Sequence, residues 1–382
     1  MSEIEIILKD QLSDNPSILT TSQAVLLYEK APLNDLLFVA NRMRERRVPG
    51  RIVTYLIDRN INYTNICTIN CHFCSFYRPP GHKENYTQSI NQISERIREL
   101  EEIGGSRILM QGGVNPDLEL EWYTDLITEL IARHPKISLD CFSPIEVEGI
   151  AEVSGLTTRE VLTEFKDAGM HGLPGGGAEM LVDSVRSGIS PLKGSAKNWL
   201  RVMEEAQEIG LTTSATNVFG FGENIEHRVE HMSKIRDLQD RSVSKGLTGF
   251  TSFIAWPVML ENNSFGKMNK GTNRIELGAG SVEYLRHVAV SRLFLHNISH
   301  IQASWPTMGL SVAQIALNAG ADDIGSTMME ENVVSASGTT KTDASIDELK
   351  NSILDAGYTP CERDSDYNIL NVHTERIQSV VR

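Results

Sequence analysis

Three cysteines in one short stretch have the clearest chemical potential in this chain. Cys67, Cys71 and Cys74 follow one another at spacings of four and three residues. Thiolates at such spacings can close on one soft metal centre. A [4Fe–4S] cluster normally takes four cysteines, one for each iron. The stretch therefore predicts a cluster held by three thiolates, with one iron left open to bind a small molecule.

A zinc site is the main alternative for the same thiols. Cys71 and Cys74 form a C-x2-C pair, which His72 or His82 can complete. A structural zinc site usually has a second pair of ligands a short distance downstream. The chain has no second C-x2-C pair. The spacing therefore favours the cluster over zinc and over uncoordinated thiols.

The elements that must position this stretch alternate between strand-like and helix-like segments. The expected strands cover residues 61–65, 107–110, 137–142, 171–173, 212–218, 249–254, 301–303 and 322–325. The expected helices between them cover residues 92–103, 122–132, 158–168, 197–209, 227–238, 284–295 and 312–319. Alternation repeated about eight times predicts a parallel sheet closed into an α/β fold, a (β/α)8 TIM-type barrel.

Helical segments flank the expected barrel on both sides. Residues 1–50 repeat apolar positions at helical spacing, so we expect an N-terminal helical extension there. The barrel itself is expected over residues 51–345. Ser345 and Glu348 form a capping box, which predicts a C-terminal helix within residues 346–382, packed on the barrel and followed by a frayed tail.

Composition limits the classes of function. The chain of 382 residues has a formal net charge of −14, which does not favour binding to nucleic acid. No apolar run reaches the roughly 18 residues of a membrane span, and the start of the chain, Met1–Glu5, lacks the basic residues of a secretory signal. Five cysteines, with three of them in one loop, do not suit a disulfide framework. We therefore expect a cytoplasmic protein with a small-molecule substrate.

Residues with chemical potential directly follow several of the expected strands. They are Gln111-Gly112-Gly113 after the second strand, Ser143 after the third, Glu179 after the fourth and Glu223 after the fifth. The loops that follow the strands of a (β/α)8 barrel share its C-terminal face, where active sites form. We therefore expect these residues to meet the cysteine stretch at one site.

Residue chemistry leaves more than one role open at these positions. Gly112 and Gly113 expose backbone carbonyls that can accept from an ammonium group, or they form a tight turn. Glu179 can bind a ribose diol, remove a proton, or lie on the surface of its glycine-rich loop. Arg78, just past the cysteines, can clamp a carboxylate, or its loop is only a rigid connection.

The C-x3-C-x2-C stretch, with the aromatic Phe73 before its last cysteine, resembles the radical S-adenosylmethionine (SAM) superfamily. The resemblance implies a [4Fe–4S] cluster on Cys67, Cys71 and Cys74, whose open iron chelates the methionine part of SAM and whose electron releases a 5′-deoxyadenosyl radical. The superfamily has a Gly-Gly-Glu-like motif where this chain has Val114 as the third residue. The cofactor contacts that the resemblance implies are Phe73, Gly112, Gly113, Ser143, Glu179 and Glu223. Glu179 is also the candidate catalytic residue.

Longer motifs narrow the resemblance to one family. The stretches Cys74–His82, Met110–Gly113, Asn115–Leu118 and Ser326–Val334 look like those of the cyclic dehypoxanthinyl futalosine synthases. These radical SAM cyclases belong to the futalosine route to menaquinone. The resemblance implies hydrogen abstraction from the sugar C4′ of the substrate, radical addition to its arene, and a reducing partner such as flavodoxin or ferredoxin. The chain departs from the family's pattern at Phe221-Gly222 and at Ala255.

Two other interpretations remain open. Aminofutalosine synthase and the subunits of the deazaflavin (FO) synthase are near relatives of this family and act on other substrates. A non-catalytic iron–sulfur or zinc-binding protein belongs to a different class and would bind metal without cleaving SAM. Turnover of SAM with each candidate substrate separates the three interpretations.

Overall fold

A single mixed sheet organises the computed structural model, which describes residues 1–330, 332–337, 341 and 343–374. Its strands are β1 Ile52–Leu56, β2 Asp58–Ile61, β3 Arg107–Met110, β4 Ser138–Cys141, β5 Gly172–Leu173, β6 Thr212–Phe219, β7 Phe250–Pro257, β8 His300–Gln302, β9 Asp323–Ser326, β10 Thr359–Arg363 and β11 Ile369–Val372. Their order in the sheet is β11-β10-β1-β9-β8-β7-β6-β5-β4-β3-β2. Neighbours pair in parallel except β10 with β11, so the expected parallel α/β sheet is confirmed.

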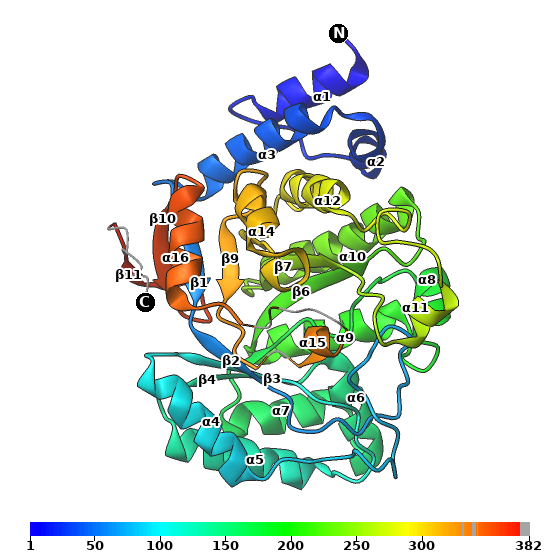
Figure 1. Ribbon diagram of the computed structural model, residues 1–382, viewed down its shortest axis with the longest axis vertical. Helices are drawn as coiled ribbons and strands as arrows, with labels where there is room; N and C mark the ends of the chain where they lie inside the picture. The colour runs from blue at the N-terminus through cyan, green and yellow to red at the C-terminus, as the bar shows by residue number, and fades with distance from the viewer. Residues whose placement is uncertain (331, 338–340, 342, 375–382) are drawn as a thin grey trace.

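Helices cover the outside of the curled sheet (Figure 1). Those of the N-terminal part are α1 Glu3–Gln11, α2 Thr21–Lys30 and α3 Leu33–Arg47. Those that follow are α4 Ile90–Glu102, α5 Leu120–Arg133, α6 Pro144–Ser154, α7 Thr158–Ala168, α8 Asp183–Ile189, α9 Ala196–Ile209, α10 Ile225–Ser244, α11 Ser264–Met268, α12 Ser281–Phe294, α13 Trp305–Met308, α14 Leu310–Leu317, α15 Val333–Ala336 and α16 Ile346–Asp355. Helix α3 packs against α12, and α2 packs against α10 and α12. The N-terminal helices therefore lie at one end of the long axis, as a layer on the outer helices.

One short stretch of chain supplies strands near both ends of the sheet. Only Ile57 separates β1, which pairs with β9 and β10, from β2, which pairs with β3. The backbone of Arg59 forms a parallel bridge with Met329, just after β9. The sheet therefore curls until its edge strand β2 reaches the chain just after β9.

The expected first strand was placed wrongly. It was expected at residues 61–65, whereas the strands run from Ile52 to Leu56 and from Asp58 to Ile61. The second of them begins with Asp58, Arg59 and Asn60, all of which are buried. The paired backbone of β3 and an ion pair between Asp58 and Arg107 hold these polar residues inside. Such long-range partners leave no trace in the local hydrophobic pattern, because they come from distant parts of the chain.

Local signals place most helices well. Thr157 caps α7 as part of a capping box, and Ser345 caps α16 in the same way, so both expected starts are confirmed. On α4, the residues Ile93, Ile97 and Leu100 are buried, at the spacing of one helix face. An N-terminal cap and an apolar stripe both depend on residues within a few positions, which is why the sequence predicts them.

The C-terminal tail corrects another expectation. It was expected to fray after its helix, but β10 and β11 join the edge of the sheet beyond β1. The last strand residue of β10, Arg363, donates from Nε to Asp323 Oδ2 at 2.6 Å, and both side chains are almost completely buried. Residues 375–382 lie outside the described part of the chain. The buried ion pair and the strand pairing explain why residues up to Val372 are held.

Loss of this ion pair is expected to destabilise the fold strongly. In an Arg363→Ala variant, the Asp323 carboxylate remains buried without its guanidinium. We expect the free energy of unfolding to fall by about 3–5 kcal/mol, because breaking a buried pair leaves an uncompensated charge. Urea denaturation of the purified chain measures this change. The matched control is Arg133→Ala, which breaks an exposed pair with Glu129 and is expected to cost at most about 1 kcal/mol. Equal losses in the two variants would contradict the argument.

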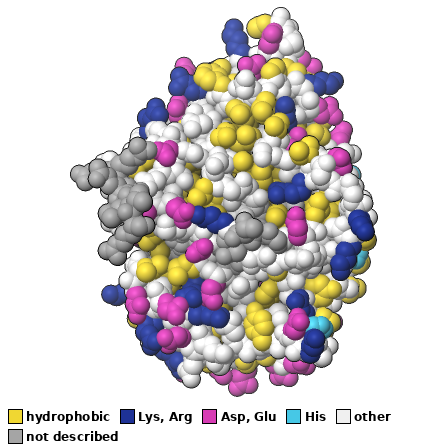
Figure 2. All heavy atoms as spheres, viewed as in Figure 1, with side chains coloured by type: hydrophobic (Ala, Val, Ile, Leu, Met, Phe, Trp, Pro, Cys, Tyr) yellow, Lys and Arg dark blue, Asp and Glu magenta, His cyan; other side chains and the backbone are white. Residues whose placement is uncertain are grey.

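The outer surface mixes charges of both signs. Figure 2 shows Lys and Arg side chains interspersed with Asp and Glu side chains over the face that it presents, without a broad basic area. This distribution agrees with the acidic net charge of −14. Among the described helices, none is both long and apolar enough to cross a membrane.

Candidate active site

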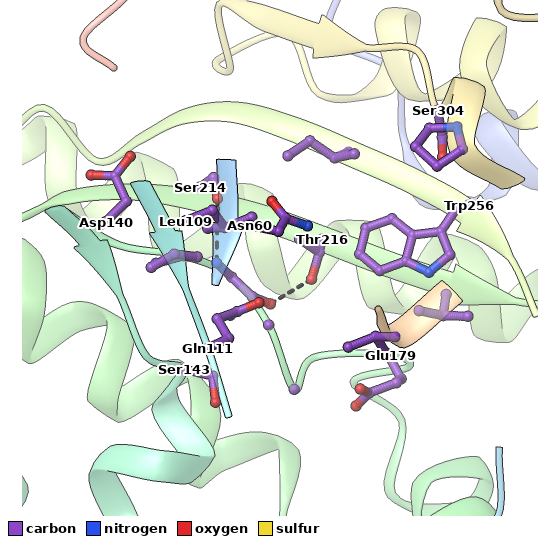
Figure 3. A pocket seen from close by; sticks show the side chains of 18 of the residues that line it. Asn60, Leu109, Gln111, Asp140, Ser143, Glu179, Ser214, Thr216, Trp256 and Ser304 are labelled. Atoms are coloured by element: carbon purple, nitrogen blue, oxygen red, sulfur yellow. Dashed lines mark hydrogen bonds between the residues drawn. The ribbon is translucent and has the colours of Figure 1, made fainter. Parts of the chain in front are cut away.

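A cavity of about 400 Å³ lies inside the curled sheet and includes the loops that follow the carboxyl ends of its strands. Of the nine residues that the resemblance assigns to the cluster and the cofactor, eight line it: Cys67, Cys71, Phe73, Cys74, Gly112, Gly113, Ser143 and Glu179. Figure 3 shows side chains from successive strands and their following loops pointing into this space, with Trp256 above Glu179 and Asp140 at the opposite end. Glu223 is the exception, because it is not among the lining residues. The curled sheet thus brings together segments that lie far apart in the sequence.

Backbone hydrogen bonds fix the cysteine loop on three sides. The Cys67 N–H donates to the Arg78 carbonyl at 2.9 Å, and the Thr68 N–H donates to the Val114 carbonyl at 3.1 Å. The His72 N–H donates to the Ile189 carbonyl at 2.9 Å. The loop is therefore held by its own continuation, by the segment that follows β3 and by the end of α8.

The thiols suit a cationic metal centre. Burial raises the pKa of Cys74 to about 11 and also raises the pKa of Cys67. Thiolates, the form that binds metal, therefore need compensating positive charge at this site, which the irons of a cluster supply. The three thiols of the cysteine loop therefore fit a [4Fe–4S] cluster.

The zinc alternative finds less support. In the described chain, no group of three or more His, Cys, Asp and Glu side chains is close enough to hold one metal ion. A tetrahedral zinc site needs its ligands within about 2.3 Å of the same ion, whereas each thiolate of a cluster binds a different iron. The ring Nδ1 of His72 lies 3.2 Å from the Gly188 carbonyl, and His82 Nδ1 accepts from the Glu84 N–H at 3.2 Å. His72 thus uses a ring nitrogen on α8, and His82 uses one within its own loop.

Two glycines let the segment that follows β3 approach the cysteine loop. A Cβ added at Gly113 would lie 2.1 Å from the Ile66 carbonyl oxygen and 2.7 Å from Cys67 Cβ. A Cβ at Gly112 would lie 2.8 Å from the ring of Tyr63. These distances are far below van der Waals contact. Gly112 and Gly113 therefore have a close-packing role, which leaves their backbone next to the thiols.

Glu179 does not stand alone in the cavity wall. Its Oε1 lies 2.9 Å from Nζ of Lys193, and its Oε2 lies 3.8 Å from Nη1 of Arg186. All three side chains are buried, and Oε2 of Glu179 has no hydrogen-bond partner in the described structure. Glu179 also has a positive φ of 38°, which aims it from the glycine-rich turn after β5. The carboxylate thus has one paired oxygen and one that a ligand hydroxyl can satisfy.

Ser143 belongs to a second buried carboxylate system. Ser143 Oγ donates to Glu146 Oε2 at 2.7 Å, while Tyr63 and the Gly112 N–H donate to Glu146 Oε1 at 2.8 and 2.9 Å. Burial raises the pKa of Glu146 to about 7, although these hydrogen bonds oppose the shift. Glu146 lines the cavity. A carboxyl group with this pKa can accept or release a proton near neutral pH.

Glu223 has a structural role in its own loop. Its carboxylate accepts from the backbone N–H groups of Gly220 and Phe221, at 2.9 and 2.6 Å. It also pairs with Arg228 at 2.6 Å and is fully buried. The side chain is saturated and turned into the protein. The expectation that Glu223 itself contacts a cofactor is therefore corrected: its carboxylate shapes the turn after β6.

Phe73 packs at the apolar rim of the cavity. Its ring centroid lies 5.4 Å from that of Phe221, which in turn lies 5.4 Å from Phe265. Phe221 is one of the residues that depart from the family's pattern, and here it helps to fix the aromatic side chain of the cysteine loop. Core packing and cavity lining are both roles of Phe73.

Arg78 is committed to its own loop. Its Nη1 donates to the carbonyls of Ser75, Phe76 and Tyr77 at 3.0–3.2 Å, and its Nε pairs with Glu84 at 2.7 Å. Arg78 is not among the residues that line the cavity. Its role is therefore to shape the loop after the cysteines, and the structure does not support a carboxylate clamp at this position.

Lys193 and Glu146 are the site residues that sequence reasoning missed. Lys193 lies in a loop without a strand before it, so its position carried no signal. Glu146 did carry one, because Ser143 and Glu146 have the S-x-x-E spacing of a helix start. Ser143 is indeed the N-cap of α6, and the same spacing places the glutamate in the cavity wall.

Two family profiles match this chain. The Radical SAM superfamily profile matches residues 61–235, and the CofH/MqnC C-terminal region matches residues 247–376. Together they extend from the last residue of β2 to beyond β11, with a short gap at residues 236–246.

Similar proteins cover nearly the whole chain. The cyclic dehypoxanthine futalosine synthase of Halalkalibacterium halodurans is 42% identical over 95% of this chain and 94% of its own length. The enzyme of the same name from Streptomyces coelicolor is 38% identical over 94% of this chain and 87% of its own length. The 5-amino-6-(D-ribitylamino)uracil–L-tyrosine 4-hydroxyphenyl transferase of Archaeoglobus fulgidus is 37% identical over 87% of this chain and 93% of its own length.

Solved structures share the fold at low sequence identity. The [FeFe]-hydrogenase maturase HydG from Carboxydothermus hydrogenoformans has a TM-score of 0.73 at 16% identity, covering 96% of this chain and 80% of that one. Methylornithine synthase, PylB, has a TM-score of 0.68 at 16% identity, covering 93% and 97%. At this identity the likeness concerns the fold alone.

Proposed function

Because the chain belongs to the radical SAM superfamily, and within it to the family of the cyclic dehypoxanthine futalosine synthases, we propose that it cyclises dehypoxanthine futalosine in the futalosine route to menaquinone. It is a radical SAM enzyme that uses a [4Fe–4S] cluster and SAM. The observation that carries the proposal is the convergence of Cys67, Cys71 and Cys74 with the glycine-rich strand ends and Glu179 on one cavity. Such a cavity can hold cofactor and substrate side by side.

The residues of the cavity divide into those that would bind the cluster and those that would position SAM. We assign the cluster to the three thiols of the cysteine loop. When bound, the cluster and SAM supply the 5′-deoxyadenosyl radical that removes hydrogen from the sugar C4′ of the substrate. The backbone of Gly112 and Gly113, next to the thiols, is suited to receive the ammonium group of SAM. The free oxygen of Glu179 is suited to accept a hydrogen bond from a ribose hydroxyl of SAM. Phe73 and Ser143 are the other residues that we assign to contact with SAM.

A proton must leave the substrate once the new ring bond has formed. The sugar radical adds to the arene, and loss of one electron to an acceptor and of one proton restores aromaticity. Glu179 and Glu146 are the two glutamates of the wall that we propose as candidates to accept this proton. Glu146 is the better suited of the two, because burial raises its pKa to about 7. Trp256 and Trp305, which line the same cavity, help to exclude water from the reacting groups.

The curled parallel sheet is consistent with a complete barrel. We propose that β1 and β2 act as one bent strand, so that with β3 to β9 they form a complete (β/α)8 barrel over residues 51–345. The helices of residues 1–50 and the segment of residues 346–382 are then additions to this barrel. We further propose a cytoplasmic location and an electron-donating partner such as flavodoxin or ferredoxin, since cluster thiols require a reducing compartment.

A second candidate function rests on a specific similarity. The 4-hydroxyphenyl transferase of Archaeoglobus fulgidus is 37% identical to this chain, which favours transfer from L-tyrosine to 5-amino-6-(D-ribitylamino)uracil as the runner-up. The cyclase is preferred because its named relative reaches 42% identity over 95% of the chain.

One anaerobic assay is expected to separate these functions. The reconstituted protein is reduced with dithionite and given SAM and dehypoxanthine futalosine, and the products are followed by mass spectrometry. We expect a product lighter than the substrate by two hydrogens, formed together with 5′-deoxyadenosine. A parallel reaction receives L-tyrosine and 5-amino-6-(D-ribitylamino)uracil instead.

The outcomes decide between the candidates. A coupled product only in the tyrosine reaction would replace the cyclase with the transferase. Absence of 5′-deoxyadenosine in both reactions, from a protein with full iron content, would contradict a radical SAM function altogether.

A further inference from the structure

Three buried side chains of the cavity wall have oxygens without hydrogen-bond partners. They are Asn60 of β2, Asn62 directly after β2, and Asp140 of β4. All three line the cavity, and none is more than 8% exposed. Within the described part of the chain, no group donates to Oδ1 of any of them. Buried polar atoms normally have partners, so three free acceptors on one wall indicate a site for a ligand.

Strand pairing places these side chains on one face. Asn60 pairs with Leu109 of β3, and Leu109 pairs with Asp140 of β4. Paired positions of neighbouring strands point to the same face, and so do alternate residues of one strand, which adds Asn62. Figure 3 shows Asn60 and Leu109 between Asp140 at one end of the cavity and Glu179 at the other. The free acceptors therefore form a stripe along the wall.

One end of this stripe lies beside the cysteine loop. The Asn62 side chain donates from Nδ2 to the Gln111 carbonyl at 3.0 Å. Gln111 directly precedes Gly112 and Gly113, and Gly113 is packed closely against Ile66 and Cys67. A ligand bound along the stripe therefore has one part next to the groups that we assign to the cluster and SAM.

The chemistry of the stripe selects hydroxyl groups. A free acceptor oxygen is satisfied only by a donor. The proposed substrate has hydroxyl groups on its sugar, whereas its ketone and its ionised aryl carboxylate only accept. At the far end of the stripe, Arg107 already pairs with Asp58 and lies 3.6 Å from Asp140. Two carboxylates thus face one guanidinium there, which disfavours a third carboxylate from the substrate.

We propose that Asn60, Asn62 and Asp140 bind the hydroxyl groups of the substrate's sugar and thereby hold its C4′ beside SAM. The inference rests on the proposed function and adds to it which part of the substrate occupies this wall. The three residues determine specificity and position through hydrogen bonds. They transfer neither a proton nor an electron.

Substrate affinity tests this role without turnover. The cluster-loaded protein is kept unreduced and saturated with SAM, and dehypoxanthine futalosine is titrated into it by calorimetry. Asn60→Leu removes the acceptor at similar volume, so a sugar hydroxyl loses its partner. We expect the Kd to rise about tenfold or more. Asp140→Asn keeps an acceptor oxygen and is expected to retain most of the affinity.

Asn297→Leu is the matched control. The Asn297 Oδ1 is also buried without a partner in the described structure, but the residue does not line the cavity. We expect its substrate Kd to equal that of the unaltered protein. A substrate analogue without the 2′- and 3′-hydroxyl groups extends the comparison. It is expected to bind the unaltered protein and Asn60→Leu equally, because it lacks the groups that Asn60 recognises.

The fate of the C4′ hydrogen provides a second readout. With substrate deuterated at C4′, Asn60→Leu and Asn62→Leu are expected to form more 5′-deoxyadenosine for each cyclised product and to transfer less deuterium into it. A sugar that is held loosely presents C4′ less often to the radical, whereas a loss of stability alone leaves this ratio unchanged. If Asn60→Leu does not fold, Asn62→Leu takes its place in both measurements.

Four results would overturn the inference. The first is an unchanged substrate Kd in folded Asn60→Leu and Asn62→Leu. The second is an equal loss of affinity for the analogue without hydroxyl groups. The third is a loss that disappears with an analogue lacking the aryl carboxylate, which would assign the wall to that group. The fourth is weaker binding of SAM with unchanged binding of substrate. By contrast, failure of the unaltered protein to bind or cyclise dehypoxanthine futalosine would count against the proposed function.

Discussion

Replacing Cys67, Cys71 or Cys74 with alanine is expected to abolish the activity in each case. Each thiolate is assigned to one iron, so a missing thiolate leaves that iron without a protein ligand. All three thiols line the cavity, and the Cys71 side of the loop is held by a hydrogen bond from His72 to Ile189. The loss should exceed the roughly 10- to 100-fold effect of removing an outer partner of a metal site. Iron and sulfide content, visible absorption and 5′-deoxyadenosine formation measure it.

Cys141→Ala is the matched control for these variants. Cys141 is completely buried in the apolar core, and burial raises its pKa well above the usual value for a thiol. Such a thiol is chemically inert, so we expect full cluster content with a modest loss of stability. Wild-type activity in any one of the three loop variants would falsify the cluster assignment. Loss of the cluster in Cys141→Ala would show that cluster assembly depends on general stability.

Gly113→Ala is expected to damage the site almost as strongly without removing a ligand. The new methyl carbon would lie 2.1 Å from the carbonyl oxygen of Ile66 and 2.7 Å from Cys67 Cβ. Neither atom can rotate away, because one belongs to the backbone and the other is fixed to it. The Cys67 N–H is also tied to the Arg78 carbonyl at 2.9 Å. Either the cysteine loop or the segment that follows β3 must therefore move.

The expected result is a lower cluster content and a loss of about 100-fold or more in turnover, which is the cost of a misplacement of about 1 Å at a reacting centre. The same measurements apply as for the cysteine variants. Gly188→Ala is the control, because a Cβ at Gly188 would meet no atom within 4 Å and the residue lies in α8. Its activity is expected to be unchanged. Normal cluster content and turnover in Gly113→Ala would contradict this argument, because they would show that the backbone can shift without changing the site.

The sequence by itself determined the features that depend on neighbours a few positions apart. The spacing of Cys67, Cys71 and Cys74 is a property of one loop, and it indicated the cluster without any fold. The capping boxes of α7 and α16 and the apolar stripe of α4 were equally local. Strands β3 and β6 were found because each is a short apolar or β-branched run between turn residues. Strand alternation then indicated the shared face at which the loops meet.

Only the tertiary structure decided which polar side chains face the cavity and which face the protein. Glu179 and Glu223 both follow glycine-rich turns, yet Glu179 lines the cavity and Glu223 is neutralised by Arg228. Lys193 acquired its place through the packing of α8 on the cysteine loop. The polar start of β2 and the pairing of β10 likewise depend on partners far away in the chain. The physical reason is the same in each case: a buried charge is stable only beside its partner, and the fold, not the local sequence, supplies that partner.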